Sequence, residues 1–444
     1  MVAARHGRVA AMPRPVVIRY AGLIGSLLLT VAAARDGATW PWHPSMTART
    51  ILAGDNGVLS PVCWLAGTLL LIGAWVLGRK VVPSARWAYV TAALWAAPLL
   101  VTLPLGSYDV YSYACQGWAL ANGHDAYAAG ALELGCPWVD AVSPTWLDAP
   151  APYGPVFLIL AALAAKTGSI LGALIVLRLI AVLGVVLIAV SLPALARRRD
   201  VPLERAAWLA LACPLVPIHL ISGAHNDAVM VGLLVAGLAA RKAWVAGVLL
   251  GLAVGVKATA IVVLPFAFLL FPGVAFLGAA VGAVGLASLV GLGWITNLAG
   301  SGASVQWTSP STAVGMTLDL FGLDAVPITR ILGIAGLVVV LAVLWWRSRR
   351  GDPLLGAGLA LAATVALAPV FHPWYLTWPL AVLAATLRRD TLWLVVPCAV
   401  ASALCLPDGY NLALATKAQG AVAMTVLVAV VVVVLVRKRP RVAA

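Results

Sequence analysis

Long apolar segments with almost no charge recur along the whole 444-residue chain and constrain its fold more than any other feature. A bilayer-spanning helix needs roughly 20 apolar residues, and tilted or paired helices use fewer. Because 63% of the residues are hydrophobic, a soluble domain cannot bury them all. The sequence therefore predicts one all-α polytopic membrane domain over 1–444. We place its fourteen spans at 16–34, 58–78, 86–105, 170–196, 203–221, 227–240, 243–256, 259–272, 274–295, 328–347, 354–370, 373–388, 391–406 and 420–437.

The basic residues lie in short clusters between these segments, so the net charge of +14 does not indicate a nucleic-acid partner. The first segment is long for a signal peptide and is kept as a span. With the N-terminus in the cytoplasm, the clusters follow the positive-inside rule. All but seven of the 29 Lys and Arg residues then fall inside, the exceptions being Arg35, Arg49, Lys166, Arg178, Lys257, Arg330 and Lys417. Of the 15 acidic residues, only Asp200, Glu204, Asp352 and Asp390 fall inside. We predict a cytoplasmic-membrane protein with both termini in the cytoplasm.

Residues 154–167 are apolar enough to span but short. Counting them as a span would move the arginines at 197–199 outside and reverse every later loop. We therefore expect an interfacial helix, with an apolar body and a polar end at Lys166. The segment 106–169 then forms one long outer loop.

This outer loop is rich in Tyr and Trp and contains five carboxylates, at Asp109, Asp125, Glu133, Asp140 and Asp148. Aromatic rings stack on the C–H faces of sugars, and carboxylates bond to their hydroxyls. The combination is typical of a sugar site on the outer face. The alternative is an interfacial aromatic belt with solvated acids.

Asp109 differs from the other acids because it directly follows a predicted span, after Gly106. A carboxylate at the membrane boundary is partly desolvated, which raises its pKa and makes it a better general base. The alternative is an N-cap for a helix over 110–121, since Asp is a favoured cap. The two roles are compatible.

Other polar residues are predicted on the same face. His225, Asn226 and Asp227 form a tight outer turn between two spans. Lys257 lies between two short apolar helices at the outer boundary. A cation at this depth is a candidate functional residue, and a lipid phosphate is a suitable partner. Arg178 and Arg330 are two further candidate phosphate contacts. For all three cations the alternative is a structural side chain that reaches the interface.

The segment FHPWYLTWP, residues 371–379, places His372 beside Trp374 and Tyr375 at the outer start of a span. A histidine among aromatic residues is either part of a site or an interface anchor. Cys115 and Cys136 share the outer loop, where an oxidising exterior would permit a disulfide; free buried thiols are the alternative. No metal site or cofactor is predicted, because no ligand spacing such as HExxH occurs.

Several motifs, in this order, give a resemblance to a known family: YDVYSYACQG, NGHDAY, TWLDAPAPYGP, GAHNDA, GVKATA and FHPWYLTWPL. Together they resemble the polyprenyl-phosphomannose-dependent α-1,6-mannosyltransferases of the MptA/MptB type, actinobacterial members of the GT-C superfamily. The resemblance runs from about 106 to 379. It implies a GT-C-like bundle of about fourteen transmembrane helices whose long outer loop carries interfacial helices.

The resemblance also implies roles for individual residues. Asp109 matches the catalytic aspartate, and Lys257 and His372 are expected near the donor phosphate. Arg178 and Arg330 stay candidate phosphate contacts because of their positions in the predicted spans. The predicted substrate contacts are Tyr108, Tyr111, Tyr113, Gln116, Asp125, Asp148, Tyr153, His225, Asn226, Asp227, Trp374 and Tyr375.

The leading hypothesis is an inverting enzyme that moves mannose from polyprenyl phosphomannose to a mannose hydroxyl of a growing α-1,6-mannan glycolipid, outside the cytoplasmic membrane. Its partners would be that donor, a mannan or glycolipid acceptor and membrane lipids. A GT-C enzyme with another polyprenyl-phosphate sugar or acceptor is the first alternative. A transporter or lipid flippase is the second, since short, interrupted helices are typical of transporters. No internal repeat is present, and the polar residues concentrate on one face, which favours an enzyme.

Overall fold

Every regular element in the described part of the chain is a helix. The computed structural model describes residues 14–44, 46–298, 304–388, 392–409 and 411–437. The helices at the predicted spans are α1 (Pro15–Asp36), α3 (Leu59–Gly78), α4 (Ala85–Ala96) with η1 (Ala97–Leu100), α7 (Ile170–Arg198), α8 (Leu203–Leu211) with η4 (Val216–Ser222), α9 (Asp227–Ala239), α10 (Ala243–Val256), η5 (Ala258–Val263) with α11 (Leu264–Leu270), α12 (Val274–Ala287) with η6 (Ser288–Val290), α15 (Val326–Ser348), α16 (Pro353–Leu367), η8 (Pro373–Leu376) with α17 (Thr377–Thr386), α18 (Leu392–Ala403) and α20 (Lys417–Arg437).

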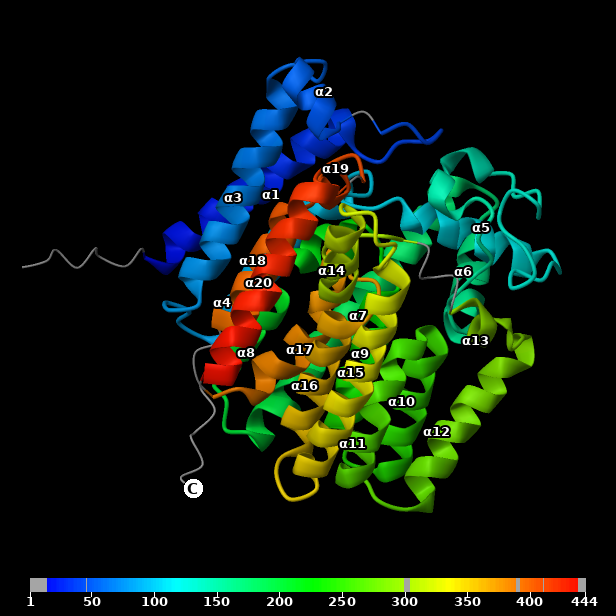
Figure 1. The fold of residues 1–444 in the computed structure, drawn as a ribbon, viewed down its shortest axis with the longest axis vertical. Coiled ribbons are helices and arrows are strands. Elements are labelled where there is room, and N and C mark those ends of the chain that lie inside the picture. The colour runs from blue at the N-terminus through cyan, green and yellow to red at the C-terminus, as the bar shows by residue number, and fades with distance from the viewer. Residues whose placement is uncertain (1–13, 45, 299–303, 389–391, 410, 438–444) are drawn as a thin grey trace, which may run out of the picture.

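Shorter helices lie in the loops between these segments. They are α2 (Ala48–Ala53), α5 (Asp109–Ala121), η2 (Val139–Ala141), η3 (Pro144–Trp146), α6 (Pro155–Ala165), α13 (Gly293–Asn297), α14 (Pro310–Asp319) and α19 (Leu412–Ala415). Figure 1 shows the long helices running roughly alongside one another, with α5 and α6 together at one side near an end of the bundle.

The apolar helices make this a membrane protein, and each of the fourteen predicted segments is helical. Five helices within the described residues are long and apolar enough to cross a bilayer, and a sixth span results if one bent pair is counted. The other predicted spans are shorter helices or broken pairs, so the number fourteen stays a prediction. The expected helix within 154–167 is α6, Pro155–Ala165, and its interfacial position also stays a prediction.

The bent pair consists of α8 and η4, which the sequence predicted as one span over 203–221. The two helices differ in direction by 61°. Pro214 lies in the break and Pro217 in the first turn of η4, and proline removes a backbone donor and disrupts the helical hydrogen-bond ladder. The bend directs η4, which carries His219 and Ser222, beneath the loop that begins at Gly106.

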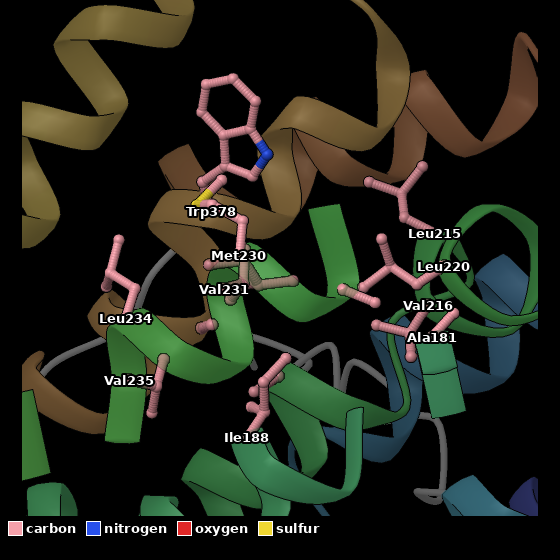
Figure 2. Close-up of a cluster of buried hydrophobic side chains, with 14 of the residues drawn as sticks. Ala181, Ile188, Leu215, Val216, Leu220, Met230, Val231, Leu234, Val235 and Trp378 are labelled. Atoms are coloured by element: carbon pink, nitrogen blue, oxygen red, sulfur yellow. The ribbon is translucent and has the colours of Figure 1, made fainter. Parts of the chain in front are cut away.

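The centre of the bundle is a core of hydrophobic side chains from α7, η4, α9 and α17. Figure 2 shows Ile188 of α7, Leu220 of η4, Met230 of α9 and Trp378 of α17 in one buried cluster. Helices α7 and α9 approach closely where each has a glycine, Gly184 and Gly232. A Cβ at Gly232 would lie only 2.5 Å from the backbone oxygen of Gly184, so the approach needs the absence of a side chain there. This packing fixes the start of α9, where a predicted site residue lies.

Candidate functional site

Asp109 begins helix α5, immediately after a sharp turn of the chain. Its backbone N–H donates to Ser107 Oγ at 3.1 Å, and Gly106 has a φ of +72°. A Cβ at Gly106 would lie 2.5 Å from His219 Cε1 and 2.6 Å from Cys405 Sγ. The turn therefore needs glycine for both its backbone angle and its close contacts. The N-cap of α5 is Tyr108, so Asp109 is the first helical residue and not the cap considered as its alternative role.

The Asp109 side chain is only 14% exposed. Burial raises the pKa of this carboxyl to about 6, although the positive charge of Lys257 and hydrogen bonds from Ser107 and Trp146 oppose the shift. A carboxylate with a pKa of about 6 is mostly ionised at neutral pH and is also basic enough to accept a proton. These are the properties that a general base requires.

His225 lies beside Asp109 and carries no charge. Its Nδ1 lies 3.8 Å from Asp109 Oδ2 and 3.3 Å from the Tyr113 hydroxyl. Its ring stacks on Trp374 with the ring centroids 3.9 Å apart. Complete burial holds the pKa of His225 well below its ordinary value, with smaller contributions from nearby His219, Lys257 and His372. The contact with Asp109 is therefore between a carboxylate and a neutral imidazole.

Asp227 and Lys257 form a buried ion pair behind Asp109. Lys257 Nζ donates to Asp227 Oδ1 at 2.9 Å and to Oδ2 at 3.0 Å, and Trp378 Nε1 donates to Oδ1 at 2.6 Å. Aromatic rings surround the ammonium, with centroids 4.5 Å away for Tyr375 and 5.8 Å away for Tyr153. Lys257 is thus partnered by a carboxylate and acts on Asp109 through its electric field.

Two cavities meet at Asp109, and both are also lined by Trp146. The larger has a volume of about 460 Å³. The smaller has a volume of about 120 Å³. The larger is lined by Trp42, Gly106, Ser107, Tyr108, Asp109, Ser143, Pro144, Thr145, Trp146, Ser304, Val305, Gln306, His372, Trp374, Gly409, Asn411, Leu414 and Lys417. The smaller is lined by Asp109, Ser112, Gln116, Trp146, Ala149, Pro150, Pro152, Tyr153, Thr296 and Asn297.

The larger cavity contains a predicted phosphate contact and a cation that sequence reasoning did not select. His372 lines it and stacks on Trp374, with ring centroids 4.6 Å apart. Burial lowers the pKa of His372 to about 3, so this ring is neutral and offers N–H hydrogen bonds. Lys417, at the start of α20, is exposed and lines the same cavity.

An apolar groove of about 450 Å³ lies next to the larger cavity. It runs between α14, α16, α18 and α20 and includes Phe371, Leu404 and Leu427. Phe371 precedes His372 of the cavity, and its carbonyl accepts a 2.7 Å hydrogen bond from Thr308, which also lines the groove. The polar cavity and the groove therefore share one wall.

The two arginines predicted as phosphate contacts bond to the protein itself. Arg178 donates to the carbonyl oxygens of Leu100, Thr102 and Ser222 at 2.7 to 2.8 Å. Arg330 donates to Ser304 O at 2.8 Å and to Thr312 Oγ1 at 3.0 Å. Arg178 lines neither cavity, whereas Arg330 supports the segment that carries Ser304 into the larger one. Their phosphate role remains a prediction, and these contacts favour structural roles.

The predicted substrate contacts divide into those at the cavities and those away from them. Tyr108 and Trp374 line the larger cavity, and Gln116 and Tyr153 line the smaller. Behind these walls lie the partly buried ring of Tyr375 and the buried side chains of Tyr111, Tyr113, Asn226 and Asp227. Asp125 and Asp148 are exposed and line neither cavity.

A disulfide joins Cys115 of α5 to Cys136 of the following loop, which settles the alternative that the sequence left open. Both cysteines are buried with Val142, and Trp146 packs against this cluster. The bond thus ties the loop that carries Trp146 to the helix that carries Asp109. Sequence reasoning did not select Trp146, although it lay among the aromatic residues of the outer loop.

Comparisons with known proteins give the same family as the motifs in the sequence. Residues 19–273 match the family model described as the N-terminal domain of alpha-(1→6)-mannopyranosyltransferase, and residues 308–437 match the MptB C-terminal domain. Alpha-(1→6)-mannopyranosyltransferase A of Mycobacterium tuberculosis is 34% identical, over 82% of this chain and 79% of the relative. Alpha-(1→6)-mannopyranosyltransferase B of Corynebacterium glutamicum is 30% identical, over 84% of this chain and 73% of the relative. No solved structure matches the chain significantly.

Proposed function

The chain belongs to the alpha-(1→6)-mannopyranosyltransferase family, and from this premise we propose that it transfers mannose from polyprenyl phosphomannose to the 6-hydroxyl of a mannose at the end of a growing α-1,6-mannan glycolipid. The observation that carries the proposal is the position of Asp109, a partly buried carboxylate at the junction of two cavities. One cavity holds a cation and borders an apolar groove, as an amphiphilic phosphosugar requires.

In the proposed reaction Asp109 is the general base. The acceptor oxygen attacks the anomeric carbon of the donor mannose, and its proton passes to the Asp109 carboxylate. The bond between that carbon and the phosphate oxygen breaks, and its electron pair leaves with the polyprenyl phosphate. Attack from the face opposite the leaving phosphate inverts the anomeric centre. Positioned proton acceptance typically accelerates such a step by about 10²–10⁴-fold.

The larger cavity is the proposed donor site. Lys417 supplies the positive charge that favours a departing phosphate, and the neutral ring of His372 supplies a hydrogen bond. Lys257 contributes in a different way. Paired with Asp227, it keeps Asp109 more acidic than burial alone would make it.

The apolar groove beside the donor site supports a lipid-linked donor. Nearly all its lining is hydrophobic, and the side chains of Trp393, Val396 and Val400 at its α18 wall are about half exposed. A polyprenyl chain in this groove would cover apolar surface while its phosphate entered the cavity behind His372. A nucleotide sugar would leave the groove unused.

The active site is proposed on the outer face of the cytoplasmic membrane, with both termini inside. The positive-inside distribution supports this orientation. The Cys115–Cys136 disulfide supports it independently, because disulfides persist on the oxidising side of the membrane.

The proposal is tested by presenting membranes that contain the protein with a panel of polyprenyl-phosphate sugars and an α-1,6-linked dimannoside acceptor. We expect mannose to be transferred and linkage analysis to give a 1→6 product. Preferential transfer of another sugar, or another linkage, would contradict the donor or the acceptor assignment. Movement of the lipid across liposomes without any sugar transfer would instead favour a flippase.

A further inference from the structure

The smaller cavity at Asp109 contains hydrogen-bonding groups that the reaction as described above does not use. Asp109, Ser112 and Gln116 follow one another on α5 at positions i, i+3 and i+7, which lie on one face of a helix. All three line the cavity, so one wall presents a carboxylate, a hydroxyl and a carboxamide in succession.

Two of these polar atoms are buried and lack a hydrogen-bond partner. Neither Ser112 Oγ nor Gln116 Oε1 bonds to any atom of the residues that the structure describes. Ser112 is only 5% exposed. Buried polar groups are normally paired, so unpaired groups that line a cavity indicate a ligand with its own hydroxyls.

The charges of the two cavities differ. Lys417 lines the larger cavity, whereas the described residues that line the smaller include no Lys or Arg. An anionic phosphate therefore suits the larger cavity, and a neutral polyol suits the smaller. Asp109 is accessible from both and lies between them.

The smaller cavity has about a quarter of the volume of the larger one, about 120 Å³ against about 460 Å³. A sugar that enters it reaches Asp109 with the hydroxyl that projects farthest from its ring. A primary hydroxyl projects from the ring on its own carbon, whereas the secondary hydroxyls are attached directly to the ring.

From these observations we infer that the smaller cavity is the acceptor subsite, that it takes a hexopyranose with its hydroxymethyl group directed toward Asp109, and that Ser112 and Gln116 hydrogen-bond to this sugar. This inference rests on the proposed function and adds the origin of its 1→6 selectivity. The O6 proton passes to Asp109 while O6 bonds to the anomeric carbon and the phosphate leaves with the electron pair of the broken bond. Ser112, one turn from Asp109, donates its hydroxyl to O6.

The first test separates the two cavities by substrate dependence. Gln116→Leu keeps the side-chain size and removes the carboxamide that is proposed to bond to the acceptor. Gln306→Leu makes the same change in the larger cavity. With polyprenyl phosphomannose and an α-1,6-dimannoside, we expect Gln116→Leu to raise the acceptor KM about tenfold and leave the donor KM within about twofold. Gln306→Leu should do the reverse.

The second test uses the same dimannoside without O6 on its terminal sugar, assayed as an inhibitor. In the wild type we expect this analogue to compete with the acceptor but not with the donor, and to bind about tenfold more weakly than the acceptor. In Ser112→Ala the acceptor should bind only slightly more tightly than the analogue. The affinity of the analogue itself should stay nearly unchanged.

The outcomes distinguish the inference from the function on which it rests. Absence of mannose transfer by the wild type would overturn the proposed function and the inference with it. Transfer by the wild type, with Gln116→Leu raising the donor KM instead, would overturn the inference alone. The same would follow if Ser112→Ala weakened the acceptor and its 6-deoxy analogue equally.

Discussion

Both carboxylate oxygens of Asp227 accept from the ammonium of Lys257, at 2.9 and 3.0 Å, and the carboxylate is completely buried. Breaking a buried pair by removing one partner leaves an uncompensated charge, which typically costs about 3–5 kcal/mol. The pair joins the start of α9 to the end of α10, directly behind Asp109. It is therefore a structural element of the site as well as a source of charge.

We predict that Lys257→Met lowers the thermal unfolding temperature of the detergent-purified protein strongly, because Asp227 is left buried and unpaired. The double variant Lys257→Met/Asp227→Asn should recover most of the loss, since the Asn carboxamide oxygen still accepts from Trp378 Nε1. Equal destabilisation of the single and double variants would show that the pair itself is not the cause.

The activity should depend on the protonation of Asp109. Burial raises the pKa of this carboxyl to about 6, so its basic form is present above that pH and lost below it. We expect kcat/KM to fall as the pH is lowered through about 6, in proportion to the protonated fraction. In Lys257→Met the midpoint should move to higher pH, because the positive charge of Lys257 lowers the pKa of Asp109. An acid limb near pH 4 in both proteins would contradict this assignment.

Gly106 should be required for the geometry of the site. We expect Gly106→Ala to reduce activity at least tenfold, because its Cβ would overlap His219 and Cys405. Gly123→Ala is the matched control. Gly123 also has a positive φ, +80°, but its Cβ would meet no atom within 4 Å. Both variants incur roughly 1–2 kcal/mol of backbone strain, so a difference in activity reports the contacts of Gly106. Similar losses in both would leave no special role for those contacts.

The disulfide should support both stability and activity. We predict that Cys136→Ser lowers stability by about 2–4 kcal/mol, as loss of a native disulfide commonly does. Its activity should fall because the loop that carries Trp146 is no longer tied to α5. Cys63→Ala, which changes a buried free cysteine of α3, serves as the control. Full activity of Cys136→Ser with an unchanged acceptor KM would show that the disulfide does not determine the geometry of the site.

The helical segments were readable from sequence because apolar length dominates in a membrane protein. The predicted span 170–196 corresponds to α7, and 328–347 corresponds to α15. Breaks within spans were harder to foresee. Residues 203–221 read as one apolar segment, and the 61° bend depends on how the prolines at its centre pack against neighbouring helices.

Within the site, local signals located residues but not their partners. Asp109 and His372 were predicted together, and both line the larger cavity. Lys257 was expected near the donor phosphate, which stays a prediction, and the sequence did not indicate that its ammonium pairs with Asp227. Lys417 was recognised only as an outer cation. Its place in the cavity comes from the packing of α14 and α20, which contact each other although a hundred residues separate them, and no local pattern encodes this contact.

The central claim is that Asp109 accepts the proton of the acceptor hydroxyl, and Asp109→Asn tests it most directly. The substitution keeps the shape of the side chain and removes its basicity. Asp125→Asn, at an exposed acid of the same loop, is the control. With equal amounts of folded protein in membranes, polyprenyl phosphomannose and the dimannoside, we predict a loss of about 10²–10⁴-fold in kcat for Asp109→Asn and wild-type rates for Asp125→Asn. Wild-type rates in Asp109→Asn would contradict the account.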